Sequence, residues 1–129
     1  MASTTTAAHT PDLRVQVAGL HLQNPIIAAS GTCGYGEELH PFVDLNCLGA
    51  VAVKGLSLKP TRGNPGPRLV ETTGGMLNSV GLHNIGIEAF ITQKLPALRQ
   101  HQRTRIIVNF FGDSPAEYAA VAERASDAE

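Results

Sequence analysis

The sequence has no tryptophan and only two cysteines, Cys33 and Cys47, among its 129 residues. Two cysteines cannot form the disulfide framework of a small secreted domain, and they do not have the CxxC spacing of zinc ligands. We therefore expect two reduced thiols, no bound metal and a cytoplasmic location.

Charge is also scarce, since 16% of the residues are charged and the net charge is −1. This balance gives no electrostatic reason to expect nucleic acid or an anionic membrane as a partner. Lys59, Arg62 and Arg68 lie close in sequence, but without interleaved aromatic residues they indicate a solvated loop. No apolar run reaches the ~18 residues of a membrane span. The first eleven residues are small and polar, which predicts a disordered tail rather than a signal peptide.

Apolar residues make up 43% of the chain and fall into short runs. Alternation over 13–17, a turn at Gly19 and a return over 20–22 predict a small hairpin. The runs 26–29, 50–53 and 105–111 do not alternate. Such runs are typical of strands that are buried on both faces of a parallel sheet.

Helical patterns separate these strands. The segment 37–46 has a weak pattern that Pro41 interrupts. The segment 85–95 has a stronger pattern, with a break or a restart at Pro96, and a third helical pattern covers 115–129. Ser114 as N-cap and Glu117 as the partner of a capping box support the last of these. A second hairpin is expected over 68–80. The order of strands and helices along the chain predicts three parallel βα units. Together they make up one domain at 12–129. They form either a small open sheet or an incomplete (β/α)8 TIM barrel.

Polar or small residues follow each predicted strand at its carboxyl end. Ala29 and Ser30 close the first strand, Lys54 and Gly55 close the second, and Asn109 lies in the last turn of the third. Carboxyl ends of parallel strands meet at one face, where such folds bind ligands. Lys54 would there face an anion or an electron-rich ring. The alternative is that Lys54 extends from a strand end into water.

A second candidate is the loop 78–84, with amides at Asn78 and Asn84 around a glycine. Two amides could hold a small planar polar ligand, because each offers a donor and an acceptor. The alternative is a turn that uses Asn and Gly for backbone reasons. Cys33 has no evident base nearby, so we interpret it as a packing residue.

Four stretches together resemble the class 1 dihydroorotate dehydrogenases. They are ASGTCGYG (29–36), VKG (53–55), GNPGPRLVET (63–72) and NSVGLHN (78–84). The sequence of these stretches is most similar to that of the subclass that passes electrons to NAD through an iron–sulfur flavoprotein partner.

The resemblance implies an FMN-containing (β/α)8 barrel that oxidises dihydroorotate to orotate in pyrimidine biosynthesis. It implies that Ala29, Ser30, Lys54, Gly55 and Asn109 contact FMN, and that Lys54 also reaches the substrate. It further implies a substrate-holding loop made of Asn78, Ser79, Val80, Gly81 and Leu82. The full-length protein is expected to be an oligomer.

The chain also departs from the family pattern. The family's catalytic base is a cysteine on a later loop, expected beyond Glu129, and neither cysteine here matches its motif. Cys33 and the pair Phe110-Phe111 replace residues of other kinds. We therefore expect a fragment of the barrel that aggregates and has no turnover alone. The alternatives are another flavin-dependent pyrimidine oxidoreductase, of the dihydropyrimidine dehydrogenase type, and a non-catalytic remnant.

Overall fold

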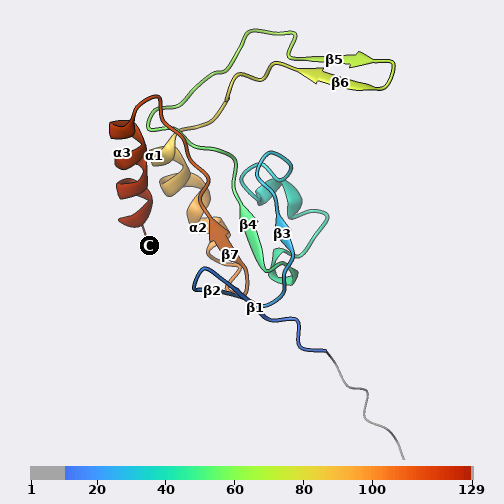
Figure 1. Ribbon diagram of the computed structural model, residues 1–129, viewed down its shortest axis with the longest axis vertical. Coiled ribbons are helices and arrows are strands. Elements are labelled where there is room, and N and C mark those ends of the chain that lie inside the picture. Colours follow the sequence, from blue (N-terminus) through green and yellow to red (C-terminus); the bar gives the residue numbers. More distant parts are fainter. Residues whose placement is uncertain (1–10, 129) are drawn as a thin grey trace, which may run out of the picture.

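A three-stranded parallel sheet forms the centre of the computed structural model, which describes residues 11–128. Its order is β3 (Ile27–Ala28), β4 (Ala50–Ala52) and β7 (Arg105–Ile107). Ala28 pairs with Val51, and Val51 pairs with Ile106 (Figure 1). The three predicted parallel strands are confirmed, although each is shorter than its apolar run.

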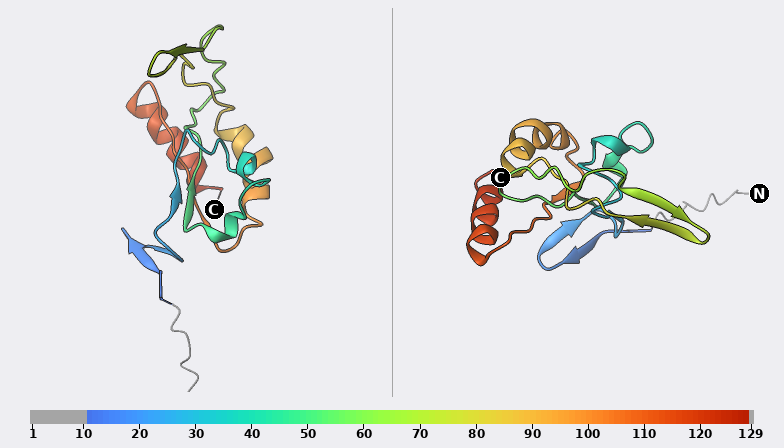
Figure 2. Two further views of the ribbon diagram at one scale, coloured as in Figure 1. Left: turned by 90° about the vertical axis from the view of Figure 1, so that its right-hand side faces the viewer. Right: turned by 90° about the horizontal axis from the view of Figure 1, so that it is seen from above.

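Two helical segments cover one face of this sheet (Figure 2). The first is continuous from α1 (Ile87–Ala89) through the π-helical turn η3 (Phe90–Lys94) to α2 (Leu95–Leu98), and the second is α3 (Pro115–Ser126). The core lies between these helices and the sheet. Its fully buried side chains include Val51 and Val53 of the β4 run, Phe90 and Val121.

The opposite face of the sheet has no helix over it among the described residues. Because strand side chains alternate, Val51 and Val53 face the helices while Ala52 faces the other side. Ile27, which precedes the core-facing Ala28, is 42% exposed, and Ile26 is 58% exposed. The prediction that residues 26–29 are buried on both faces is therefore wrong, since only one face is covered.

Of the two outcomes predicted at Pro96, a break or a restart, the structure shows a restart, because a new α-helical segment, α2, begins at Leu95. The preceding turn widens, so that the Leu95 amide bonds to the Phe90 carbonyl five residues earlier. Pro96 then occupies an early position of α2, where a missing N–H costs little. The widened turn thus lets the helical segment continue to Leu98.

The weak helix expected over 37–46 is not formed as one element. It is replaced by two short 3-10 turns, η1 (Glu37–Leu39) and η2 (Leu45–Cys47), with a loop between them. Phe42 in that loop is 85% exposed. Leu45 is the buried residue of η2, so it ties this region to the core.

Both predicted hairpins are present. The first pairs β1 (Val15–Val17) with β2 (Leu20–Leu22) through Ala18 and Gly19, which both have positive φ. The second pairs β5 (Leu69–Thr72) with β6 (Gly75–Asn78) and projects away from the sheet (Figure 1). Every residue of β5 and β6 is exposed.

The start of α3 follows the predicted chemistry with one change. The Ser114 hydroxyl accepts a hydrogen bond from the Glu117 amide at 3.3 Å, as an N-cap does. The Glu117 carboxylate accepts from the Asp113 amide at 2.8 Å, one residue before the position that a capping box uses. The expected tail over 1–11 lies outside the described residues except for Pro11. Within residues 11–128, no helix has the length and apolar character needed to cross a bilayer.

Candidate functional site

The carboxyl ends of the three parallel strands meet, as predicted, at one end of the sheet. The side-chain amide of Asn109 donates a 2.8 Å hydrogen bond to the hydroxyl of Ser30. Lys54 and Gly55 follow β4, the strand that lies between the two. Residues that are distant in sequence are therefore assembled into one polar cluster, defined as Ser30, Lys54, Gly55 and Asn109.

The backbone around Gly55 is held by the chain that follows β7. The Leu56 amide donates to the Asn109 carbonyl at 3.0 Å, and the Phe111 amide donates to the Leu56 carbonyl at 2.9 Å. A Cβ on Gly55 would lie 3.4 Å from the Asn109 amide nitrogen and 3.5 Å from the Phe111 ring. The absence of a side chain at Gly55 thus keeps the space in front of Asn109 open.

Lys54 is half-buried beside this space. Its backbone amide donates to the Gly34 carbonyl at 2.7 Å. Because Val53 is fully buried in the core, alternation directs Lys54 to the side away from the helices. Among residues 11–128, no ion pair neutralises its ammonium. The ammonium is therefore available to an anionic ligand, although the same geometry lets it contact water.

The loop after β3 is closed from within. The Thr32 hydroxyl donates to the Ala29 carbonyl at 2.7 Å, and the Cys33 sulfur lies 3.3 Å from the same carbonyl. Cys33 is 1% exposed, and this burial raises the pKa of its thiol. The prediction that Cys33 is a packing residue is confirmed. Ala29 itself is exposed, next to Ser30.

The loop Asn78–Leu82 lies against the segment 62–68, not against the polar cluster. The Ser79 amide donates to the Arg68 carbonyl at 2.8 Å, and the Val80 carbonyl accepts from the Asn64 amide at 3.1 Å. A Cβ on Gly81 would approach Asn64 to 2.6 Å, so glycine is required there. In the described chain, no hydrogen bond joins this loop to Ser30, Lys54 or Asn109.

Asn84 is not a ligand-clasping amide, and for this residue the alternative prediction, an amide used for backbone reasons, is confirmed. It is 3% exposed. Its amide oxygen accepts from the backbone amides of Ser57 and Gly86, and its nitrogen donates to the Leu82 carbonyl. These bonds use the side chain to join two loops, because a buried amide has to be satisfied.

The match to the family model described as "Dihydroorotate dehydrogenase" covers residues 12–128. The chain belongs to the dihydroorotate dehydrogenase family. It is 59% identical over 114 residues to the dihydroorotate dehydrogenase B (NAD(+)) catalytic subunits of Geobacter sulfurreducens and Geobacter metallireducens. The same identity is found with the subunit of Pelobacter propionicus.

These alignments cover 88% of this chain and 37% of each relative, so the chain spans about a third of the length of the curated relatives. A similar solved structure is dihydroorotate dehydrogenase from Eimeria tenella in complex with ferulenol. It has a TM-score of 0.68 and 23% identity, with 89% of this chain and 34% of that chain covered. The fold is therefore an incomplete TIM barrel preceded by a hairpin.

One residue beside the polar cluster was not predicted from the sequence. Phe111 lies beside Gly55 and Asn109, where its ring flanks the open space. It follows Asn109 by two residues, so strand alternation could have placed both on the same side. The sequence analysis treated Phe110-Phe111 only as a departure from the family pattern.

Proposed function

We propose that this chain forms the flavin-facing part of an FMN-dependent dihydroorotate dehydrogenase that oxidises dihydroorotate to orotate in pyrimidine biosynthesis. The observation that carries the proposal is the polar cluster, in which the Ser30–Asn109 hydrogen bond lies beside Gly55 and Lys54. This arrangement lies at the ligand-binding end of a parallel sheet. The names of the curated relatives support the same reaction.

The residues present fit an isoalloxazine ring. Ala29, Ser30 and Gly55 are small, and the space in front of Asn109 exists because Gly55 has no Cβ. A flat ring needs such a surface, with polar groups at its edge. Asn109 and Ser30 would hydrogen-bond that edge, and Ala29 and Gly55 would contact the ring. FMN, when bound, supplies the acceptor for the hydride of the substrate.

Lys54 supplies the positive charge of the site. A positioned ammonium stabilises negative charge that develops on a nearby ring during the reaction, and it does so best where water is excluded. The same ammonium can pair with the carboxylate of dihydroorotate. Half-burial beside the cluster, without an acidic partner in residues 11–128, leaves Lys54 free for both roles.

The loop Asn78–Leu82 is assigned to the substrate. Asn78 and Ser79 would offer donors and acceptors to the orotate ring and carboxylate, with Val80, Gly81 and Leu82 shaping the loop. Two features support this assignment. Asn78, Ser79 and Leu82 are exposed. The loop backbone is held against Asn64 and Arg68 rather than left unsupported.

The catalytic base is assigned to no residue between 11 and 128. Cys33 is buried beneath the loop after β3, and Cys47 ends η2, before the amino end of β4. Neither thiol can reach a substrate beside Lys54. We further propose that the protein acts in the cytoplasm as an oligomer, with an iron–sulfur flavoprotein partner that passes electrons to NAD. The designation of the relatives as catalytic subunits supports a separate partner.

A chimera tests this proposal. The matching third of the Geobacter sulfurreducens catalytic subunit is replaced with this chain, and dihydroorotate oxidation is measured with an artificial electron acceptor. Bound flavin is measured by absorbance. We expect activity and stoichiometric FMN, with activity reduced about 100-fold or more in Lys54→Ala, the size of one lost electrostatic contact.

Lys59→Ala is the matched control, because it removes an exposed lysine five residues further along the chain. It should leave activity unchanged. A folded chimera without FMN, or Lys54→Ala with full activity, would contradict the proposal. Preference for dihydrouracil over dihydroorotate would show instead that the site is that of another pyrimidine oxidoreductase.

A further inference from the structure

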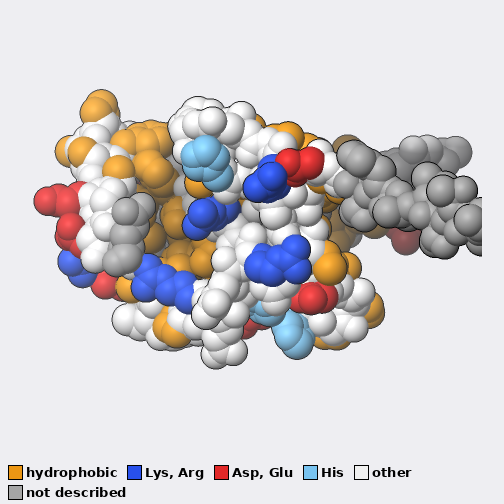
Figure 3. Space-filling model, turned by 90° about the horizontal axis from the view of Figure 1, so that it is seen from below, with side chains coloured by type: hydrophobic (Ala, Val, Ile, Leu, Met, Phe, Trp, Pro, Cys, Tyr) orange, Lys and Arg blue, Asp and Glu red, His pale blue; other side chains and the backbone are white. Residues whose placement is uncertain are grey.

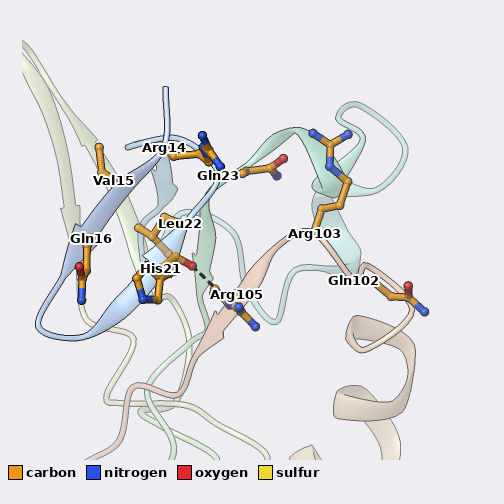
Figure 4. Close-up of a pocket in the computed structure, with 9 residues that line it drawn as sticks. All are labelled: Arg14, Val15, Gln16, His21, Leu22, Gln23, Gln102, Arg103 and Arg105. Atoms are coloured by element: carbon orange, nitrogen blue, oxygen red, sulfur yellow. Dashed lines mark hydrogen bonds between the residues drawn. The ribbon is translucent and has the colours of Figure 1, made fainter. Parts of the chain in front are cut away.

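A cavity lies at the other end of the sheet from the polar cluster. Its volume is about 460 Å³, and it opens between the β1–β2 hairpin and the turn that leads from α2 to β7. Figure 4 shows Arg14 and His21 on the hairpin side, and Gln102, Arg103 and Arg105 on the other side. Arg105 begins β7, so this cavity lies at the amino ends of the strands.

The lining of this cavity carries positive charge and no carboxylate. Arg103 and Arg105 contribute two guanidinium groups that form no ion pair within residues 11–128, whereas the third, that of Arg14, is paired with Asp12. Figure 3 shows Lys and Arg side chains gathered on this underside of the molecule. Such a concentration of one sign in a hollow attracts anions more strongly than the same charges spread over a surface.

The arginines differ in how far their donors are already used. Arg14 forms a paired contact with both carboxylate oxygens of Asp12, at 2.7 and 2.9 Å. Arg105 donates from Nε to the His21 carbonyl at 3.2 Å, which leaves its terminal nitrogens. The Arg103 side chain forms no hydrogen bond or ion pair within residues 11–128, although its backbone amide contacts Asn46. Unused N–H donors therefore remain on the Arg103 guanidinium and on the terminal nitrogens of Arg105.

We propose that this cavity binds a small organic phosphate of nucleotide size. The planar guanidinium fork matches the oxygens of a phosphate, and Arg103 and Arg105 each offer one such fork, from different parts of the lining (Figure 4). Gln102 and His21 add polar groups for the rest of the ligand, and Leu22 and Val15 add apolar surface. The volume lies within the range of ~300–1,000 Å³ that small-molecule sites occupy.

Binding there would join the hairpin to the sheet. Arg105 already connects the two through the His21 carbonyl. A phosphate bound by Arg103 or Arg105, with the rest of the ligand against the hairpin residue Leu22, would add a second connection, so the ligand should raise the melting temperature as well as bind. This site is separate from the proposed flavin site, and its test does not depend on dehydrogenase activity.

The test is calorimetric titration of the chimera described above, in which the Geobacter sulfurreducens subunit supplies the rest of the barrel, with uridine 5′-monophosphate, inorganic phosphate, uridine and succinate. Circular dichroism checks that each variant is folded. We expect uridine 5′-monophosphate to bind more tightly than phosphate, and uridine and succinate not to bind. Arg103→Gln should weaken binding about 10-fold or more, which is the loss of one charged hydrogen bond. Arg62→Gln, which removes an exposed arginine elsewhere, should have no effect.

Arg103→Gln is the deciding variant because the Arg103 side chain forms no hydrogen bond or ion pair within residues 11–128. Arg105→Gln also removes the hydrogen bond to the His21 carbonyl, so this variant can fail to fold. In that case the result for Arg103→Gln alone decides the proposal. Equal binding by Arg103→Gln and the unaltered chain would overturn the proposal. Binding of uridine as tight as that of its phosphate, or of succinate alone, would overturn it as well.

Discussion

The amide of Asn109 is hydrogen-bonded to the hydroxyl of Ser30 at 2.8 Å, across 79 residues of sequence. This bond joins the chain after β7 to the chain after β3, the two outer strands of the sheet. It therefore reports whether the carboxyl ends of all three strands are assembled.

Removing either partner should lower the free energy of unfolding. We expect a loss of about 0.5–1.5 kcal/mol for Ser30→Ala or Asn109→Ala, the usual contribution of one hydrogen bond. The double variant should lose less than the sum of the two, because both single changes break the same contact. Urea denaturation measures this coupling. Fully additive losses would show that the two side chains do not interact.

Gly49 should not tolerate a side chain. It lies just before β4, where its amide donates to the Ile26 carbonyl at 2.9 Å, and its Cβ would collide with the carbonyl oxygen of Asn24. Gly49→Ala should therefore cost about 3 kcal/mol, as forced overpacking does. Gly74→Ala is the control, since open space surrounds Gly74. Similar melting temperatures for the two variants would contradict this prediction.

The loss of a large side chain should destabilise the core far more than the β5–β6 hairpin. Phe90 is fully buried in the π-helical turn, and its ring centroid lies 6.1 Å from that of Tyr35. Phe90→Ala should lower the free energy of unfolding by about 3–5 kcal/mol. Leu77→Ala on β6, where the side chain is 66% exposed, should change it by less than about 0.5 kcal/mol. Denaturant titration compares the two, and equal losses would place the core elsewhere.

The two thiols should react at different rates with a thiol reagent at pH 8. Cys47 is exposed and should react at once, whereas Cys33 is buried and should react only as the protein unfolds. Comparison of Cys47→Ala with Cys33→Ala separates the two reactions. A rapid reaction of Cys33 in the folded chain would contradict its assignment to the core.

Burial raises the pKa of the Cys33 thiol above its ordinary value of 9.0. Above pH 9 the unfolded chain loses this proton first, so the thiol favours the unfolded state as pH rises. The stability advantage of the unaltered chain over Cys33→Ala should therefore be full below pH 9 and shrink by pH 10. Melting temperatures of the two proteins at pH 8 and pH 10 measure this change. An advantage that grows between pH 8 and pH 10 would contradict the prediction.

Local patterns predicted much of the sheet and the meeting of its carboxyl ends. The apolar runs before Ser30, Lys54 and Asn109 identified three parallel strands, and parallel pairing then required their carboxyl ends to meet. Both hairpins followed from alternation and turn residues. The helix start at Ser114 followed from capping chemistry, which depends on residues close in sequence.

Tertiary relationships set the limit of prediction. Ile27 and Val53 look equally apolar in the sequence, and only the placement of the helices makes one exposed and the other buried. Asn84 resembles a binding residue until its amide is seen to join two loops. The arginine-lined cavity combines residues 14, 103 and 105, which no local pattern connects.

The strand order β3-β4-β7 also leaves two open margins, because β3 and β7 each have a strand on one side only within residues 11–128. The unpaired backbone N–H and C=O groups of these edge strands can pair with another extended segment. The exposed side chains of Ile26 and Ile27 lie next to one of these edges. The state of this polypeptide in solution should accordingly vary with its concentration, and dilution should favour single molecules.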